Sequence, residues 1–139
     1  MIDFDNWFAN IVAASDLIAS PDALGKAWVQ GDKTITSAYD FSELAEQILG
    51  DLDLEEQTKR FSDELETRKA LAAFSAFSRA FQNVDQITNG NPALRDPSTL
   101  LKSNEWISLR EAARTIVDLP SAAPYRKASG PHLPPVQNE

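Results

Sequence analysis

The sequence contains no cysteine and a single histidine, His132. The absence of cysteine excludes disulfides, thiolate nucleophiles and cysteine-ligated zinc. With one histidine and no cysteine, the residues do not support a Ser-His-Asp triad, a Cys-His pair or a di-iron Glu-x-x-His site. His132 itself stands in a proline-rich stretch, where no rigid neighbours are expected to hold a working imidazole. We therefore predict that the protein is not an enzyme and carries no cofactor.

Long hydrophobic runs are also absent. No apolar segment approaches the roughly 20 residues that a membrane-spanning helix needs. Residues 1–5 lack the basic and apolar regions of a signal peptide. The chain of 139 residues is 42% hydrophobic, which is sufficient for one domain with a buried core. From these features we expect a soluble cytoplasmic protein that does not contact a membrane.

Basic residues are scarce in the first part of the chain. The first 58 residues contain twelve acidic side chains and only two basic ones, Lys26 and Lys33. The rest of the chain is nearly balanced, with nine acidic and eleven basic residues, so the net charge of −8 comes from the first part. A surface of this sign repels a phosphate backbone and attracts a basic protein or a divalent cation. We expect no nucleic-acid ligand and favour a basic protein partner.

The spacing of apolar residues is helical almost throughout the chain. The nearest approach to strand-like alternation, at residues 33–36, is short enough to be a connector. Capping residues at Asp5, Asp40, Asp53 and Ser103 predict where helices begin. The predicted fold is all-α, a compact bundle of five or six mostly antiparallel helices over residues 1–119, followed by an extended proline-rich tail at 120–139. The expected helices span residues 5–19, 21–30, 41–49, 54–88, 97–101 and 104–119.

The predicted helix at 54–88 is unusual because its 35 residues include neither glycine nor proline. Unbroken, it would be about 50 Å long, although a kink near Thr67 is expected where its composition changes. The later part, residues 70–82, is rich in alanine and places Phe74, Phe77 and Phe81 at helical spacing. This part is predicted to be the central core helix.

Seven acidic residues crowd into the 17 positions 40–56, around the turn expected at Gly50. They can be interpreted as a solvated surface that favours solubility. Alternatively, a concentrated negative field at a helix–helix turn steers a basic partner and fixes its orientation. The seven candidate partner-binding residues are Asp40, Glu43, Glu46, Asp51, Asp53, Glu55 and Glu56.

A subset of carboxylates suggests metal chemistry instead. Glu43-x-x-Glu46 is followed by Asp63-x-x-Glu66, and residues three apart on a helix share a face. Across about 25 residues this arrangement resembles the all-α nucleoside-triphosphate pyrophosphatases of the MazG type, whose pattern is Glu-x-x-Glu and then Glu-x-x-Asp. Here the second pair has its acids in the opposite order. The resemblance implies four carboxylates around Mg²⁺ that would bind nucleotide phosphates and activate water.

Three functions therefore remain open from the sequence. The first, which we favour, is a small acidic protein-binding module, for example an immunity or antitoxin protein that neutralises a basic toxin such as a nuclease. The second is the Mg²⁺-dependent nucleotide hydrolase. The third is a structural or oligomerisation subunit that uses the 54–88 helix as its interface. The sequence leaves the identity of the partner and the oligomeric state open.

Overall fold

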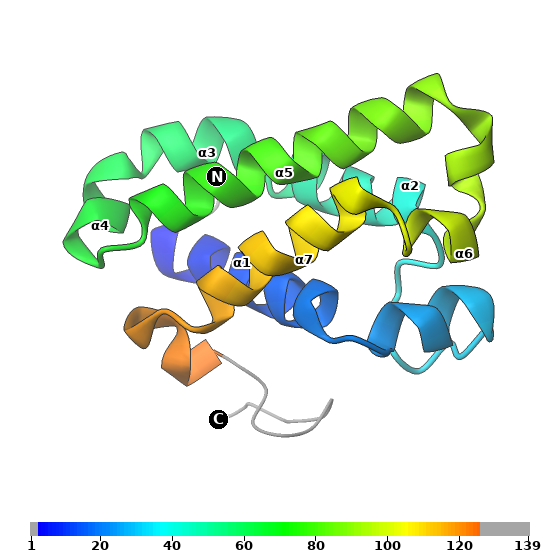
Figure 1. Ribbon diagram of the computed structural model, residues 1–139. Coiled ribbons are helices and arrows are strands. Elements are labelled where there is room, and N and C mark those ends of the chain that lie inside the picture. The colour runs from blue at the N-terminus through cyan, green and yellow to red at the C-terminus, as the bar shows by residue number, and fades with distance from the viewer. Residues whose placement is uncertain (1–2, 126–139) are drawn as a thin grey trace.

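Three long helices form the body of the structure, a computed structural model that describes residues 3–125 (Figure 1). Helix α7 (Asn104–Val117) packs against both α1 (Phe4–Ala19) and α5 (Leu71–Gly90). Helices α5 and α7 run in opposite directions (Figure 1). Residues 3–125 contain no strand, which confirms the predicted all-α class. None of the helices in this range combines the length and apolar character needed to cross a membrane.

Local sequence determines where several helices begin. Asp96 caps α6 (Pro97–Leu100) by accepting a hydrogen bond from the Thr99 N–H at 3.1 Å. Ser103 caps α7 in the same way, with the Trp106 N–H as donor at 3.1 Å, as predicted. The prediction for α1 was wrong by two residues. Asp3, not Asp5, caps this helix by accepting from the Asn6 N–H at 2.8 Å, because its extended backbone brings the carboxylate over the first turn.

Short helical turns connect the longer helices. The helix expected at 21–30 is present over residues 23–29, and most of it is the π-helical turn η1 (Gly25–Val29). The helix expected at 41–49 is present as α2 (Phe41–Ala45), continued without a break by the π-helical η2 (Glu46–Asp51). Gly50 therefore lies within the last turn and does not end it. A 3₁₀ turn, η3 (Pro92–Arg95), leads from α5 into α6.

The 54–88 run is three helices, where one helix with a kink near Thr67 was predicted. They are α3 (Leu54–Arg60), α4 (Ser62–Thr67) and α5. The break before α5 is a Schellman motif: the Ala70 N–H donates to the Leu65 oxygen at 2.8 Å and the Lys69 N–H to the Glu66 oxygen at 2.9 Å. Lys69 takes the left-handed conformation, with φ of 57°. The expected kink near Thr67 is thus a helix end, and α3 packs against α5.

Aromatic side chains from distant parts of the chain meet at the end of the molecule where α1 begins. Trp7 of α1 lies 5.3 Å from Phe61 and 5.5 Å from Phe74, measured between ring centroids. The Arg68 guanidinium lies 4.8 Å from the centre of the Phe4 ring and pairs with Asp5 at 3.0 Å. These contacts join the end of α4 to the start of α1.

The aromatic face of α5 is buried, as predicted. Phe74, Phe77 and Phe81 have no exposed surface. The opposite side of the helix reaches solvent at Ala72 and Arg79. Because α7 has a long helix packed on each side, α7 rather than α5 is the central helix of the described part.

The beginning of the predicted tail is part of the folded unit. Residues 120–125 form a 3₁₀ turn, η4 (Pro120–Tyr125), that packs against α1 and α7. Ala122 is fully buried, and the Tyr125 ring meets the Phe8 ring edge-on at 5.8 Å. For these six positions the prediction of an extended tail was wrong, because apolar side chains fix the segment to the core. The rest of the predicted tail, with His132, lies outside the described residues.

Candidate functional site

The acidic segment at residues 40–56 lies on α2, on η2 and on the connector into α3. The interior side of this segment is apolar: Phe41, Leu44, Ala45 and Ile48 are buried. Glu46 and Asp51 are exposed, while Asp40, Glu43 and Asp53 are partly buried. The carboxylates therefore lie on the outer side of an element whose inner side is held in the core.

Two tryptophans hold the backbone on either side of this segment. The Trp28 indole N–H donates to the Ala38 oxygen at 2.9 Å, two residues before Asp40. The Trp7 indole N–H donates to the Leu52 oxygen at 2.8 Å, between Asp51 and Asp53. Because an indole has one donor and a fixed ring plane, each bond fixes the direction of its carbonyl. The segment is thus anchored to η1 at one end and to α1 at the other.

The loop before α2 is ordered by short polar contacts. Asp32 accepts hydrogen bonds from the Thr34 N–H at 3.0 Å and from its hydroxyl at 2.6 Å. These two bonds lower the pKa of Asp32 below its usual value because they stabilise the ionised carboxylate. Further along, the Thr36 hydroxyl oxygen accepts from the Ala38 N–H at 3.1 Å. These bonds order the backbone of the loop up to the residue that follows Ala38.

That residue, Tyr39, is 71% exposed, the most exposed of the large apolar side chains in the described part. Its phenol lies within the field of three of the predicted site residues. The negative charges of Glu43, then Asp40, and to a smaller extent Glu46, raise the pKa of Tyr39 above 10.0 because they oppose formation of the phenolate. The charges of Asp40, Glu43 and Glu46 thus act on one exposed aromatic side chain.

The predicted helix caps differ at the two ends of the segment. Asp40 caps α2 as expected, accepting from the Glu43 N–H at 2.9 Å. Asp53 does not cap α3 through its side chain, contrary to the prediction. Its backbone is left-handed, with φ of 47°, which turns the carboxylate away from the first N–H groups of α3.

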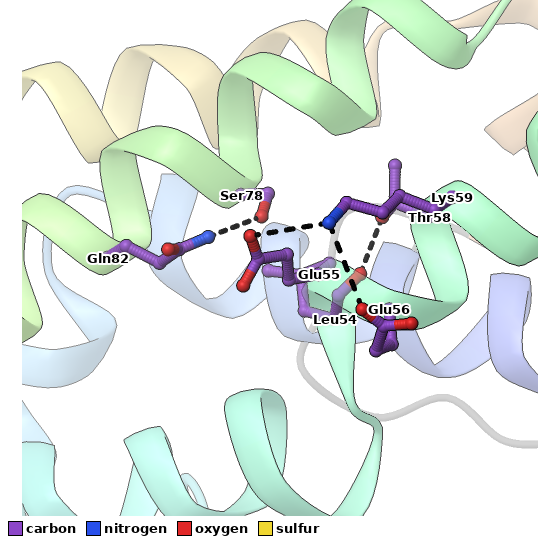
Figure 2. Close-up of polar contacts among 7 residues, drawn as sticks. All are labelled: Leu54, Glu55, Glu56, Thr58, Lys59, Ser78 and Gln82. Atoms are coloured by element: carbon purple, nitrogen blue, oxygen red, sulfur yellow. Dashed lines mark hydrogen bonds and ion pairs between the residues drawn. The ribbon is translucent and has the colours of Figure 1, made fainter.

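The remaining acidic residues are partly compensated. Lys59 lies 3.8 Å from a carboxylate oxygen of Glu55 and 3.8 Å from one of Glu56, one turn back along α3 (Figure 2). All three side chains are more than half exposed, so these pairs contribute little stability. No ion pair within residues 3–125 involves Asp40, Glu43, Glu46, Asp51 or Asp53. The uncompensated negative charge therefore lies at 40–53.

The carboxylates expected around Mg²⁺ do not converge. No three acidic or histidine side chains of the described residues are arranged to hold a metal ion. Asp63 and Glu66 belong to α4, a helix separated from the acidic turn by α3 and by the break at Phe61. The division of the 54–88 run thus separates them from Glu43 and Glu46 and removes the geometric basis of the pyrophosphatase resemblance.

Tyr39 was missed by the sequence analysis. An apolar residue directly before a helix cap normally packs against the fourth helical residue, which here is Leu44. Leu44 is buried but Tyr39 is not, so Tyr39 does not make this contact. The sequence does contain one indication. Tyr39 stands in an expected connector between two polar stretches, and this position favours exposure of its side chain.

Comparisons with family models, with curated proteins and with solved structures find no match for this chain.

Proposed function

We propose that the protein is an acidic protein-binding module that neutralises a basic partner in the cytoplasm, in the manner of an immunity protein acting on a basic toxin. The observation that supports this proposal is the exposed Tyr39 ring beside three carboxylates without ion-pair partners in the described residues. Aromatic residues are frequent energetic centres of protein interfaces. Carboxylates around such a residue raise the association rate of a basic protein and fix its orientation.

The rigidity of the segment supports the same function. A binding surface that is already ordered loses less conformational entropy when the complex forms. The hydrogen bonds from Trp28 and Trp7, together with the buried apolar side of α2 and η2, provide this order. A nuclease is one suitable partner class, because its phosphate-binding cleft is basic and can be filled by carboxylates.

The alternative functions have less structural support. The oligomerisation function would use the 54–88 helix as its interface, and that run is three shorter helices. The hydrolase function required a convergence of carboxylates that the described residues do not make.

The test begins with capture of partners from the native host on the immobilised protein, with washes at low and high ionic strength. A second column carries the variant Asp40→Asn, Glu43→Gln, Glu46→Gln. We expect basic proteins that are retained by the unmodified protein at low salt, released at high salt and lost from the variant column. The captured protein is then purified and its association rate measured against salt. A rate that the three substitutions leave unchanged would exclude a function based on electrostatic steering.

A further inference from the structure

Asn89 is the only asparagine in the chain that is followed by a glycine. It lies in the last turn of α5, directly before Gly90, and both residues are exposed. Its side-chain amide makes no hydrogen bond within residues 3–125, whereas that of Asn91 accepts from the Ala93 N–H at 3.1 Å. An exposed asparagine with a free side chain can react with the backbone nitrogen of the next residue, and glycine hinders this attack least.

The fold does not require glycine at position 90. Gly90 belongs to the helix and does not have a positive φ. A Cβ atom added to it would meet no neighbouring group within 4 Å. Glycine in a helix lowers stability relative to alanine because the unfolded chain has more freedom to lose. Glycine at this position therefore loosens the end of α5 and leaves its own nitrogen without the protection of a side chain.

The end of α5 is closed by few contacts. Asn91 leaves the helix with φ of −137°, and its N–H donates to the Ile87 oxygen at 2.9 Å. Neither a left-handed residue nor a basic side chain of the last turn binds the other terminal carbonyls, in contrast to the Schellman motif that ends α4. Thr88 is buried, so the residues after it can open without disturbing the core. Because helix ends fray, such opening releases the Gly90 nitrogen from its helical position.

We propose that Asn89 is a site of spontaneous deamidation. When the last turn of α5 opens, the Gly90 nitrogen attacks Cγ of the Asn89 side chain. The bond between this nitrogen and Cγ forms and the bond from Cγ to Nδ2 breaks. Nδ2 leaves as ammonia, together with the proton that the Gly90 nitrogen gives up. Water then opens the cyclic imide at either of its carbonyl groups, which yields an aspartyl or an isoaspartyl residue.

The reaction changes the end of α5 in two ways. It places a negative charge at the C-terminal end of a long helix, where the helix dipole disfavours a negative charge. The isoaspartyl product also adds a carbon atom to the backbone, which is incompatible with the regular helical hydrogen bonds. The modification therefore loosens the connection from α5 into η3, which packs against α5 where the chain turns back toward α6 (Figure 1).

The test follows the purified full chain during incubation at neutral and at mildly alkaline pH, with peptide mapping by mass spectrometry. Fragmentation of the peptide over residues 80–95 assigns the mass gain to one asparagine. We expect the gain at Asn89, and faster at the higher pH because the attacking nitrogen must lose its proton. The same peptide carries two controls: Asn83 lies inside α5 before a valine, and the proline after Asn91 has no N–H.

Gly90→Ala is the matched variant and is expected to fold, because the added methyl group has open space around it. Through its effect on helix stability alone, it should slow the deamidation of Asn89 by about two- to fivefold. Deamidation at the same rate in this variant would refute the proposal. So would a folded chain in which Asn89 stays unmodified while the same chain, unfolded in guanidinium chloride, deamidates there.

A second measurement checks the effect on the helix end. Asn89→Asp stands in for the aspartyl product, and Asn89→Gln is its neutral control. Hydrogen exchange at residues 87–91 should be about two- to fivefold faster in the aspartate variant than in the glutamine variant. Equal exchange in the two variants would overturn the loosening of α5 by the new charge.

Discussion

The indole N–H of Trp28 lies 2.9 Å from the carbonyl oxygen of Ala38, ten residues later in the chain. This buried bond closes the loop between η1 and α2. A carbonyl that loses such a donor without access to water carries a penalty of about 1–3 kcal/mol. The bond therefore affects both the stability of the fold and the position of Tyr39.

The first prediction concerns Trp28→Phe, which removes the donor and retains an aromatic ring. We expect its free energy of unfolding to fall by about 1 kcal/mol more than that of Trp106→Phe. Trp106 is the matched control because it is equally an aromatic member of the buried core but its indole makes no hydrogen bond to the described residues. Urea denaturation gives both values. Hydrogen exchange should also become faster in residues 31–40 of the Trp28 variant only, and equal losses of stability in the two variants would contradict the prediction.

The second prediction concerns Ser15, whose hydroxyl is fully buried in α1 and has no hydrogen-bond partner among residues 3–125. Removing an unsatisfied buried polar group is favourable, and alanine is also the better helix former. Ser15→Ala should therefore raise the free energy of unfolding by about 1 kcal/mol. Ser78→Ala is the control: this serine is also buried in a long helix, but its oxygen accepts from the Gln82 amide at 2.9 Å (Figure 2). Its removal should bring no gain in thermal or urea denaturation, and a Ser15 variant no more stable than the parent would show that the hydroxyl is satisfied.

The third prediction concerns Lys69, which occupies the left-handed position of the Schellman motif at the end of α4. Glycine adopts this conformation without the steric cost that a side chain carries. Lys69→Gly should therefore increase stability by about 1 kcal/mol. Lys69→Ala removes the same charge but keeps the Cβ atom, so it should leave stability nearly unchanged. If the two variants have the same denaturation midpoint, the backbone at this position is not left-handed in solution.

This motif also explains why the sequence predicted some features and not others. The starts of α6 and α7 were predictable because Asp96 and Ser103 act within one turn of their own position. Before α5 the sequence predicted only a kink near Thr67 and not a complete helix end, because glycine normally marks such an end and here a lysine occupies the position. The break is closed by backbone hydrogen bonds, such as the one from the Ala70 N–H to the Leu65 oxygen, and no pattern of side chains announces such a bond.

The candidate site was predictable in part for a similar reason. Clustering of the acidic residues is a property of the sequence, and the charges of Asp40, Glu43 and Glu46 all act on Tyr39. The compensation of Glu55 and Glu56 by Lys59 also follows from spacing along one helix. The position of the backbone just before Tyr39 is fixed instead by the hydrogen bond from Trp28 to Ala38, a pairing that no local pattern predicts.

The last prediction concerns the titration of Tyr39. Its pKa is raised above 10.0, chiefly by the charge of Glu43, so the folded protein keeps the phenol protonated at a pH where the unfolded chain has begun to lose the proton. Because the unfolded state then binds fewer protons, stability should fall as the pH rises from 10.0 through the pKa of the folded state. Glu43→Gln should shift the Tyr39 pKa back toward 10.0, while Glu55→Gln at the other end should not. NMR signals of the Tyr39 ring, resolved from those of Tyr125, report the titration directly, and added salt should reduce the shift because the ring is exposed. An unchanged titration in Glu43→Gln would mean that this carboxylate does not face the ring, and the proposed function would lose part of the electrostatic support that it draws from Tyr39.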